Sequence, residues 1–212
     1  MKLLNFHTHH LPQTNDEVAI LNLNSDDIAN YTGICSIGLH PWYLNVQDSQ
    51  NQTDVIQQMA ALNHVVAIGE CGLDHLCGID FQLQQDVFES MIQISELHQK
   101  PLIIHCVKAF DELIEIKLRK RPTQNWILHG FRGNTKQAIQ LLKLGFFFSF
   151  GAKYKMQTIK DLPLNSFFIE TDDSQVDIES IYQKIAFEKQ LSVVTLAENI
   201  RNNAYNLLNL KI

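Results

Sequence analysis

Short apolar runs recur along the chain and predict the strands of a parallel sheet. Each run is rich in β-branched and aromatic residues and is apolar at consecutive positions, which is typical of strands buried on both faces. The expected strands are Leu3–Phe6, Val18–Leu23, Ile34–Leu39, Val65–Ile68, Leu102–Ile104, Trp126–Leu128, Phe146–Phe150 and Phe167–Ile169.

Helical spacing fills most of the segments between these runs. From Leu83 to Ile94, for example, apolar residues recur every three or four positions with polar residues between them. Asn134 or Thr135 is placed to cap the start of a later helix. The expected helices lie near residues 83–94, 110–118, 138–142, 155–161, 177–189 and 195–208.

This alternation of strands and helices predicts an α/β protein with a compact TIM-like (β/α)8 barrel. Only a short loop around His10–Glu17 fits between the first two strands, and the helix near 155–161 is brief. A seven-stranded or slightly distorted barrel is therefore an alternative. An open doubly wound sheet is another, although no GxGxxG motif follows the first strand.

Composition favours one folded domain over residues 1–212. Hydrophobic residues make up 45% of the chain and charged residues 19%, which excludes a disordered protein, and no linker or repeat divides the sequence. The net charge of −6 disfavours a protein that coats nucleic acid through a broad basic face. It does not argue against a small anionic substrate held by metal ions.

The four cysteines and the amino-terminal segment indicate the cellular compartment of the protein. No cysteine pair has CxxC spacing, which argues against zinc fingers and thioredoxin-type sites. Most of these cysteines lie in or beside apolar runs, as buried thiols in a reducing compartment do. Residues 1–7 lack the apolar stretch of a signal peptide, and no segment is apolar enough to span a membrane. We therefore expect a cytoplasmic protein that does not bind membranes.

Six potential metal ligands lie at the expected carboxyl ends of five separate strands. Parallel strands in a barrel place these ends on one rim, where the active sites of such barrels lie. Each residue alone is weak evidence, since a single histidine or carboxylate is more often structural. The six residues are His7, His9, Glu70, His105, His129 and Asp172.

Imidazole and carboxylate groups are the ligands of zinc, manganese, iron and similar divalent ions. Six ligands exceed what one tetrahedral ion needs, so the set predicts two ions with a bridging carboxylate and water. Such a pair would make hydroxide available near neutral pH and would hold the oxygen of the group under attack. The metal could be Zn, Mn, Mg, Ni or Fe.

Six short motifs, five of which include these residues, resemble the TatD family of metal-dependent hydrolases, within the amidohydrolase-like superfamily. The most specific motif is AIGECGLD at residues 67–74, which matches the family's AIGExGLD. The others are the HxH at 7–9, GLHP at 38–41, PLIIH at 101–105, HGFRG at 129–133 and ETD at 170–172.

The resemblance implies a TIM-like barrel with a two-metal site. It implies that one ion binds His7, His9, Glu70 and Asp172. The other would bind His105 and His129, with Glu70 bridging the two. Asp172 would also orient or deprotonate the attacking water, so Asp172 and Glu70 are the expected catalytic residues. Members of the family are described as phosphodiesterases that act on DNA, often as exonucleases.

Five further residues are expected to contact substrate. Lys108 and Arg132 follow ligand-bearing strands and could hold a phosphate oxygen. His40 and Asp74 would line the pocket and orient ligands or substrate, and His75, like Trp42, could stack on a base or sugar. The family's usual arginine after the fifth strand is replaced by Val107, and Asp173-Ser174 also departs from the family pattern. These differences bear on the substrate more than on the metals.

The leading hypothesis is a metal-dependent phosphodiesterase or deoxyribonuclease that acts on a DNA end or a small anionic substrate. The main alternative uses the same site to hydrolyse an amide, a lactone or another small substrate. A third is a non-catalytic protein that binds metal or nucleic acid. The physiological substrate, the metal, the preference for chain ends and the oligomeric state are left open, with a monomer among the options.

Overall fold

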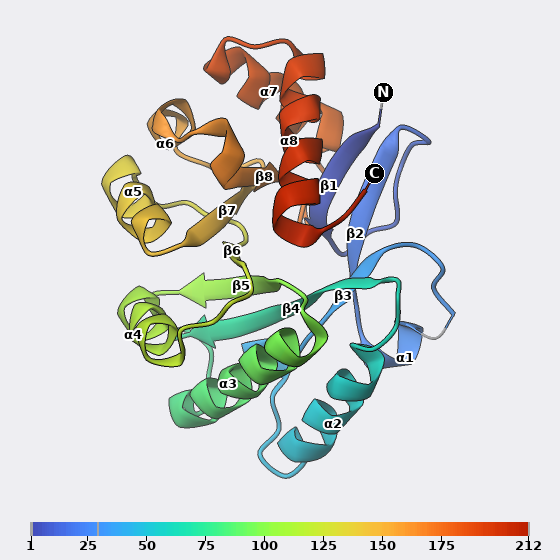
Figure 1. Ribbon diagram of the computed structural model, residues 1–212, viewed down its shortest axis with the longest axis vertical. Helices are drawn as coiled ribbons and strands as arrows, with labels where there is room; N and C mark the ends of the chain where they lie inside the picture. The colour runs from blue at the N-terminus through green and yellow to red at the C-terminus, as the bar shows by residue number, and fades with distance from the viewer. Residues whose placement is uncertain (1, 29, 212) are drawn as a thin grey trace. The chain divides into compact units, whose positions relative to one another are not determined.

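The computed structural model describes residues 2–28 and 30–211 (Figure 1). The first two strands follow one another directly, strands and helices then alternate as far as the last strand, and two helices close the chain. The strands are β1 (Leu3–Thr8), β2 (Glu17–Leu23), β3 (Cys35–Ile37), β4 (Val65–Asp74), β5 (Leu102–Val107), β6 (Trp126–Leu128), β7 (Phe146–Phe150) and β8 (Phe167–Ile169). The helices are α1 (Ser25–Ile28), α2 (Ser49–Met59), α3 (Phe81–His98), α4 (Phe110–Lys120), α5 (Thr135–Lys143), α6 (Met156–Asp161), α7 (Ile178–Lys189) and α8 (Val193–Leu208). Two 3₁₀ turns, η1 (Pro41–Tyr43) and η2 (Leu164–Ser166), complete the described elements.

The strand order follows the chain from β1 to β8. A doubly wound sheet would instead reverse its strand order at a switch point. The predicted (β/α)8 class is therefore confirmed over its open-sheet alternative.

The chain divides into two compact units. The terminal unit comprises Met1–Leu21 and Leu128–Ile212, and the central unit comprises Asn22–Ile127. The single domain over residues 1–212 stays a prediction.

In the terminal unit, β1 pairs in parallel with β2, and β7 pairs in parallel with β8. Phe6 of β1 stacks on Phe168 of β8, with ring centroids 4.3 Å apart. Helices α7 and α8 anchor to these strands through buried polar groups: the Tyr182 hydroxyl donates to the Leu4 carbonyl, and the Asn203 amide donates to the Phe167 carbonyl. These contacts hold β1, which carries His7, and β8, which precedes Asp172.

In the central unit, β3, β4 and β5 pair in parallel. β4 runs on to Asp74, well past the predicted end at Ile68, so Glu70 lies inside the strand rather than after it. Two glycines explain the difference, because they interrupt the apolar pattern yet belong to the strand. Gly69 and Gly72 have φ values of +143° and +148°, which favour glycine.

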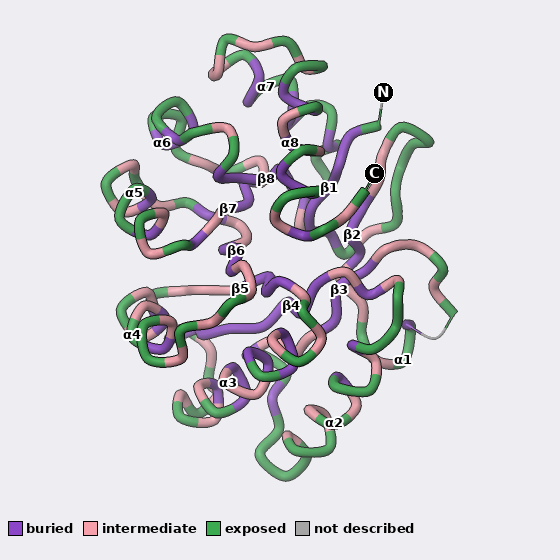
Figure 2. The backbone as a smooth tube through the Cα atoms, viewed as in Figure 1, coloured by how far each residue is buried: buried purple, intermediate pink, exposed green. Residues whose placement is uncertain are grey.

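The strands are largely buried, whereas the longer helices have one buried and one exposed side (Figure 2). Helix α2 was not predicted, because its sequence is mostly polar and only Ile56 of its residues is buried. The predicted cap by Asn134 is confirmed, since its side chain accepts a hydrogen bond from the Gln137 amide. Across residues 2–28 and 30–211, no helix combines the length and apolar character needed to cross a membrane.

Candidate metal centre

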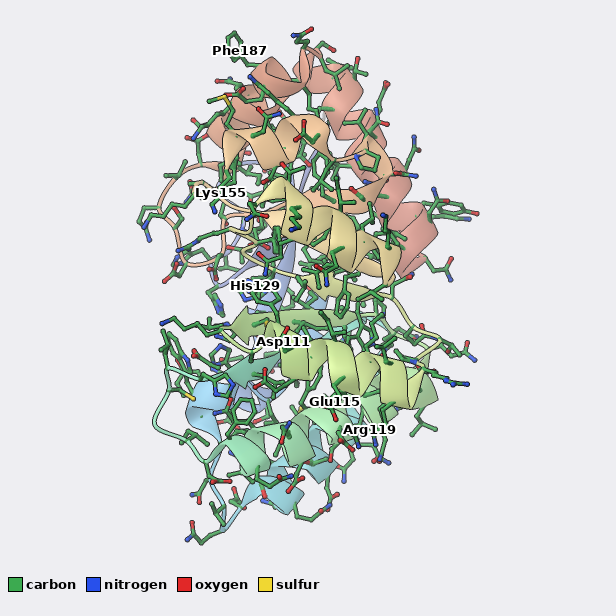
Figure 3. All side chains as sticks on the ribbon, turned by 90° about the vertical axis from the view of Figure 1, so that its left-hand side faces the viewer. Asp111, Glu115, Arg119, His129, Lys155 and Phe187 are labelled. Carbon is green, nitrogen blue, oxygen red and sulfur yellow. The ribbon has the colours of Figure 1, made fainter. Side chains whose placement is uncertain are left out.

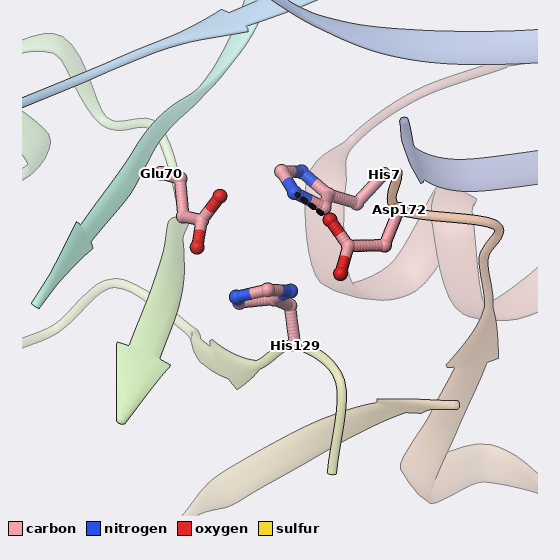
Figure 4. A group of neighbouring side chains, drawn as sticks. All are labelled: His7, Glu70, His129 and Asp172. Atoms are coloured by element: carbon pink, nitrogen blue, oxygen red, sulfur yellow. Dashed lines mark ion pairs between the residues drawn. The ribbon is translucent and has the colours of Figure 1, made fainter. Parts of the chain in front are cut away.

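His7, His9 and Asp172 converge in the terminal unit because the segment after β8 pairs with the end of β1. The Asp172 amide donates to the His7 carbonyl at 3.0 Å, and the His9 amide donates to the Asp172 carbonyl at 3.2 Å. Asp172 takes a left-handed backbone with φ of +57°, which aspartate tolerates better than most residues. The Asp172 Oδ1 atom then lies 3.7 Å from His7 Nε2, as Figure 4 shows, and 3.6 Å from His9 Nε2.

His129 follows β6, and its ring centroid lies 4.7 Å from that of His7. Behind it lies Glu170, whose side chain is fully buried and whose Oε1 atom is 3.6 Å from His129 Nδ1. Glu170 also accepts hydrogen bonds from the Gly130 amide, at 2.6 Å, and from the Ser149 hydroxyl. The Glu170 carboxylate is therefore surrounded by several hydrogen-bond donors.

Burial raises the pKa of the Glu170 carboxyl, but His129, His7 and the Ser149 hydroxyl together lower it below its ordinary value of 4.5. Glu170 is therefore ionised and can only accept hydrogen bonds. It favours a proton on His129 Nδ1, which leaves Nε2 with the lone pair. One ligand atom from each of His7, His129 and Asp172 lies within 4.8 Å of the others.

The central unit contains a second group of this kind, around Glu70 and His105. The register pairs Gly72 with His105, which brings β4 and β5 together at this level. His105 Nδ1 lies 2.9 Å from Glu70 Oε1, and His105 Nε2 lies 3.1 Å from Asp74 Oδ2. A carboxylate thus faces each ring nitrogen of His105.

Asp74 is almost fully buried and holds a fixed orientation. The Trp42 indole donates to its Oδ2 atom at 2.7 Å, and the Leu76 amide donates to its Oδ1 atom at 2.7 Å. Burial raises the pKa of Asp74, but these bonds and His105 together lower it below its ordinary value of 3.8. The ionised Asp74 therefore stabilises a proton on His105 Nε2 and leaves Nδ1 facing Glu70.

His40 is oriented by the backbone of η1. Its Nδ1 atom accepts a hydrogen bond from the Trp42 amide at 3.2 Å, so a neutral ring carries its proton on Nε2. That atom lies 3.1 Å from Glu70 Oε1 and can donate to it. In this tautomer His40 orients the Glu70 carboxylate, and His40, Glu70 and His105 together form a compact group of potential ligand atoms.

Both groups suit a divalent cation by their donor chemistry. Zinc ligands about 2.1 Å from the ion lie roughly 3.4 Å apart at tetrahedral corners. The nitrogen–oxygen distances of 3.6 and 3.7 Å at Asp172 are close to that separation. In the central unit, the lone pair of His105 Nδ1 and the Glu70 carboxylate face each other at 2.9 Å, an arrangement that a proton or a cation stabilises.

The residues predicted to contact substrate have different surroundings. Arg132 and Lys108 are exposed and follow β6 and β5. His75 stacks on Phe81 at 3.9 Å between ring centroids, and its Nε2 atom lies 2.8 Å from Glu112 Oε1. The ring of His75 is therefore already engaged, and Asp74 orients His105 rather than presenting an open carboxylate.

The sequence pattern indicates no role for Glu170 or Ser149, and it predicts only stacking for Trp42. Glu170 stands in the ETD motif directly after β8. A carboxylate that follows a fully buried strand is the signal that could have identified it. Trp42 and Ser149 gave no such signal, because their contacts join strands and turns distant in the sequence.

Comparison with known proteins identifies related sequences over most of the chain. The sequence model of a family described as TatD related DNase matches residues 11–209. YjjV from Escherichia coli K12, named an uncharacterized metal-dependent hydrolase, is 27% identical over 200 residues, which cover 82% of this chain and 76% of that protein. BU355 from Buchnera aphidicola, with the same description, is 32% identical over 65% of this chain.

The first curated relatives are longer than the part that matches. The chain spans 62% of the length of the first and 57% of the length of the second.

Two solved structures match this chain over nearly its whole length. The crystal structure of YjjV, a TatD homologue, has a TM-score of 0.83 at 23% identity and covers 98% of both chains. A TatD family hydrolase from Entamoeba histolytica has a TM-score of 0.79 at 15% identity, also over 98% of both chains.

Proposed function

The chain belongs to the TatD related DNase family, and from this premise we propose that it is a metal-dependent hydrolase of phosphate esters. Its substrate would be a DNA end or a small phosphodiester. The observation that carries the proposal is that two histidines, His129 and His105, each have a buried, ionised carboxylate at one ring nitrogen. Metal-binding histidines have this arrangement, because the carboxylate fixes the tautomer and makes the other nitrogen a better ligand.

The proposed centre holds two divalent ions and uses the six predicted ligands. His7, His9, Glu70 and Asp172 would hold one ion, and Glu70, His105 and His129 the other. Support comes from the ligand order along the sequence, from the family's motifs and from the clustering seen separately within each unit. Bound divalent ions would lower the pKa of a coordinated water and offset negative charge on the phosphoryl group.

The side chains have separable tasks in this proposal. Asp172 would orient the attacking water and accept its proton at a carboxylate oxygen. Glu170 and Asp74 would hold His129 and His105 in the ligating tautomer, and His40 would orient Glu70. Arg132 and Lys108 would contact phosphate oxygens from the loops after β6 and β5.

A substrate panel tests the proposed reaction. The protein, freed of metal and then supplied with Mn²⁺ or Zn²⁺, is assayed with bis(p-nitrophenyl) phosphate and with aryl amides and lactones. We expect turnover of the phosphodiester that requires the added metal and falls by at least about 100-fold in His129→Ala and Asp172→Ala. Glu115→Gln, on an exposed part of α4, serves as a control that keeps wild-type rates.

Two outcomes contradict the proposal in different ways. Turnover of amides or lactones alone would assign the site to another class of hydrolase. Metal binding without turnover of any ester, with equal DNA binding by wild type and both variants, would indicate a non-catalytic protein.

A further inference from the structure

A pocket in the terminal unit opens directly beside Asp172. It has a volume of about 140 Å³ and is formed by three loops that follow β6, β7 and β8. Its lining includes Arg132 from the first loop, Lys153 from the second, and Asp172 and Asp173 from the third. Because Asp172 lies on its wall, a molecule bound in the pocket would be adjacent to a proposed metal ligand.

The carboxylates and the cations around the pocket differ in the partners that they have within the protein. Glu170 accepts hydrogen bonds from the Gly130 amide and the Ser149 hydroxyl, and Asp172 faces His7 and His9. Arg132 and Lys153 are both exposed. Within the described ranges 2–28 and 30–211, neither takes part in an ion pair or a side-chain hydrogen bond. The pocket therefore offers two cationic side chains, from two separate loops, that are available to an anion.

The occupant that best fits these features is a phosphate group. A guanidinium can bind two phosphate oxygens at once, and an ammonium can contact a third as a point charge. A tetrahedral phosphate presents oxygens in enough directions to reach both loops, whereas a planar carboxylate has only two. We infer that this pocket is the phosphate subsite of the enzyme and that Arg132 and Lys153 hold the non-bridging oxygens of the substrate.

This inference rests on the proposed hydrolysis of phosphate esters and makes it more specific. The position of Lys153 after the seventh strand already makes it a phosphate candidate in the sequence, and the pocket places it with Arg132 around one cavity. Asp173 is the lining carboxylate that no described ion pair engages, and it would repel an anion. Removing the charge of Asp173 should therefore strengthen phosphate binding, whereas removing the charge of Arg132 or Lys153 should weaken it.

The test measures binding of phenyl phosphate to the metal-loaded protein by titration calorimetry, with benzoate as the planar comparison. We expect phenyl phosphate to bind more tightly than benzoate. Arg132→Gln and Lys153→Gln should each weaken phenyl phosphate binding about tenfold, as expected for loss of a hydrogen bond to a charged group. Asp173→Asn should strengthen it by roughly two- to fivefold.

Lys155→Gln provides a matched control for general charge effects. Lys155, which is labelled in Figure 3, is exposed and lies on the same loop as Lys153, but it is not among the residues that line the pocket. It should bind phenyl phosphate as the wild type does. Equal weakening in the Lys155 and Lys153 variants would overturn the inference, as would wild-type affinity in both Arg132→Gln and Lys153→Gln.

Metal content, measured by elemental analysis on each sample, separates this inference from the proposed function. If the wild type retains its metal but Arg132→Gln and Lys153→Gln bind phenyl phosphate as tightly as the wild type does, only the phosphate subsite is contradicted. Wild type that binds no divalent ion contradicts the proposed function. Phenyl phosphate binding that depends on Arg132 would support the pocket even in that case.

Discussion

Glu170 and Asp74 each lie behind a histidine ring, and this position determines which ring nitrogen can bind a cation. Both carboxyls have pKa values below their ordinary ones, because the hydrogen-bond donors and nearby histidines outweigh the effect of burial. An ionised carboxylate accepts from an imidazole N–H and leaves the other nitrogen as a lone-pair donor. The two residues therefore position His129 and His105 without needing to contact a metal ion themselves.

The substitution Glu170→Gln tests this positioning. The amide can still accept a hydrogen bond but carries no charge, so it favours the ligating tautomer of His129 less strongly. We expect the affinity for Zn²⁺ to fall about 10- to 100-fold, measured by competition with a chelating dye, while the circular dichroism spectrum is retained.

Glu112→Gln is the matched control for Glu170→Gln, because Glu112 also pairs with a histidine, His75, that is not a proposed ligand. It should leave the zinc affinity unchanged. Wild-type affinity in Glu170→Gln, with its fold intact, would show that Glu170 does not position a ligand.

At the scale of elements, the close approach of β4 to β5 depends on glycine. A Cβ atom at Gly72 would lie 2.0 Å from the His105 carbonyl oxygen, and the φ of +148° is also unfavourable for other residues. Gly72→Ala should therefore lower the free energy of unfolding by at least about 1–3 kcal/mol, measured by urea denaturation.

Gly78→Ala is the control for this change, because a Cβ atom there meets no other atom within 4 Å. It should alter the free energy of unfolding by less than about 0.5 kcal/mol. Equal stability of the two variants would mean that β4 can move away from β5 at little cost.

Helices α3 and α4 are joined by ion pairs of Glu89 with Arg119, at 2.6 Å, and with Lys120. Burial raises the pKa of Glu89, but the two cations together lower it below its ordinary value of 4.5. Because the folded-state pKa is the lower one, the stabilisation is complete above pH 4.5 and is lost as the pH falls through the folded-state value.

Glu89→Gln should accordingly destabilise the protein by about 1 kcal/mol at neutral pH, and the difference from wild type should shrink toward zero in acid. Urea denaturation at several pH values measures this. Glu115→Gln, on an exposed part of α4 beside Asp111 and Arg119 (Figure 3), should show no difference at any pH. If the difference in the free energy of unfolding between Glu89→Gln and wild type did not change with pH, the ion pairs of Glu89 could not be its cause.

At the scale of the whole molecule, the apolar runs predicted the strand order and the fold class. β6, β7 and β8 begin and end where the pattern placed them, because each is a short run buried on both faces. β4 extends further than predicted, since glycines at 69 and 72 interrupt its apolar pattern. Helix α2 was missed because its sequence is mostly polar, with apolar residues only at Val55, Ile56 and Met59.

The candidate ligands could be named from the sequence because each closely follows a short apolar run. Their supporting contacts could not be predicted. The bond from Trp42 to Asp74 joins residues on η1 and β4, and the bond from Ser149 to Glu170 joins β7 to the segment after β8. Such pairs depend on side-chain directions that only the folded chain fixes. The assignment of the six ligands to two ions stays a prediction.

Anomalous diffraction from a crystal grown with Mn²⁺ or Zn²⁺ tests that assignment most directly. We expect two anomalous peaks in each chain. One should contact His7, His9 and Asp172, the other should contact His105 and His129, and Glu70 should bind both. No peak at these residues, or full occupancy retained in the Asp172→Ala and His129→Ala variants, would contradict the proposed two-metal centre.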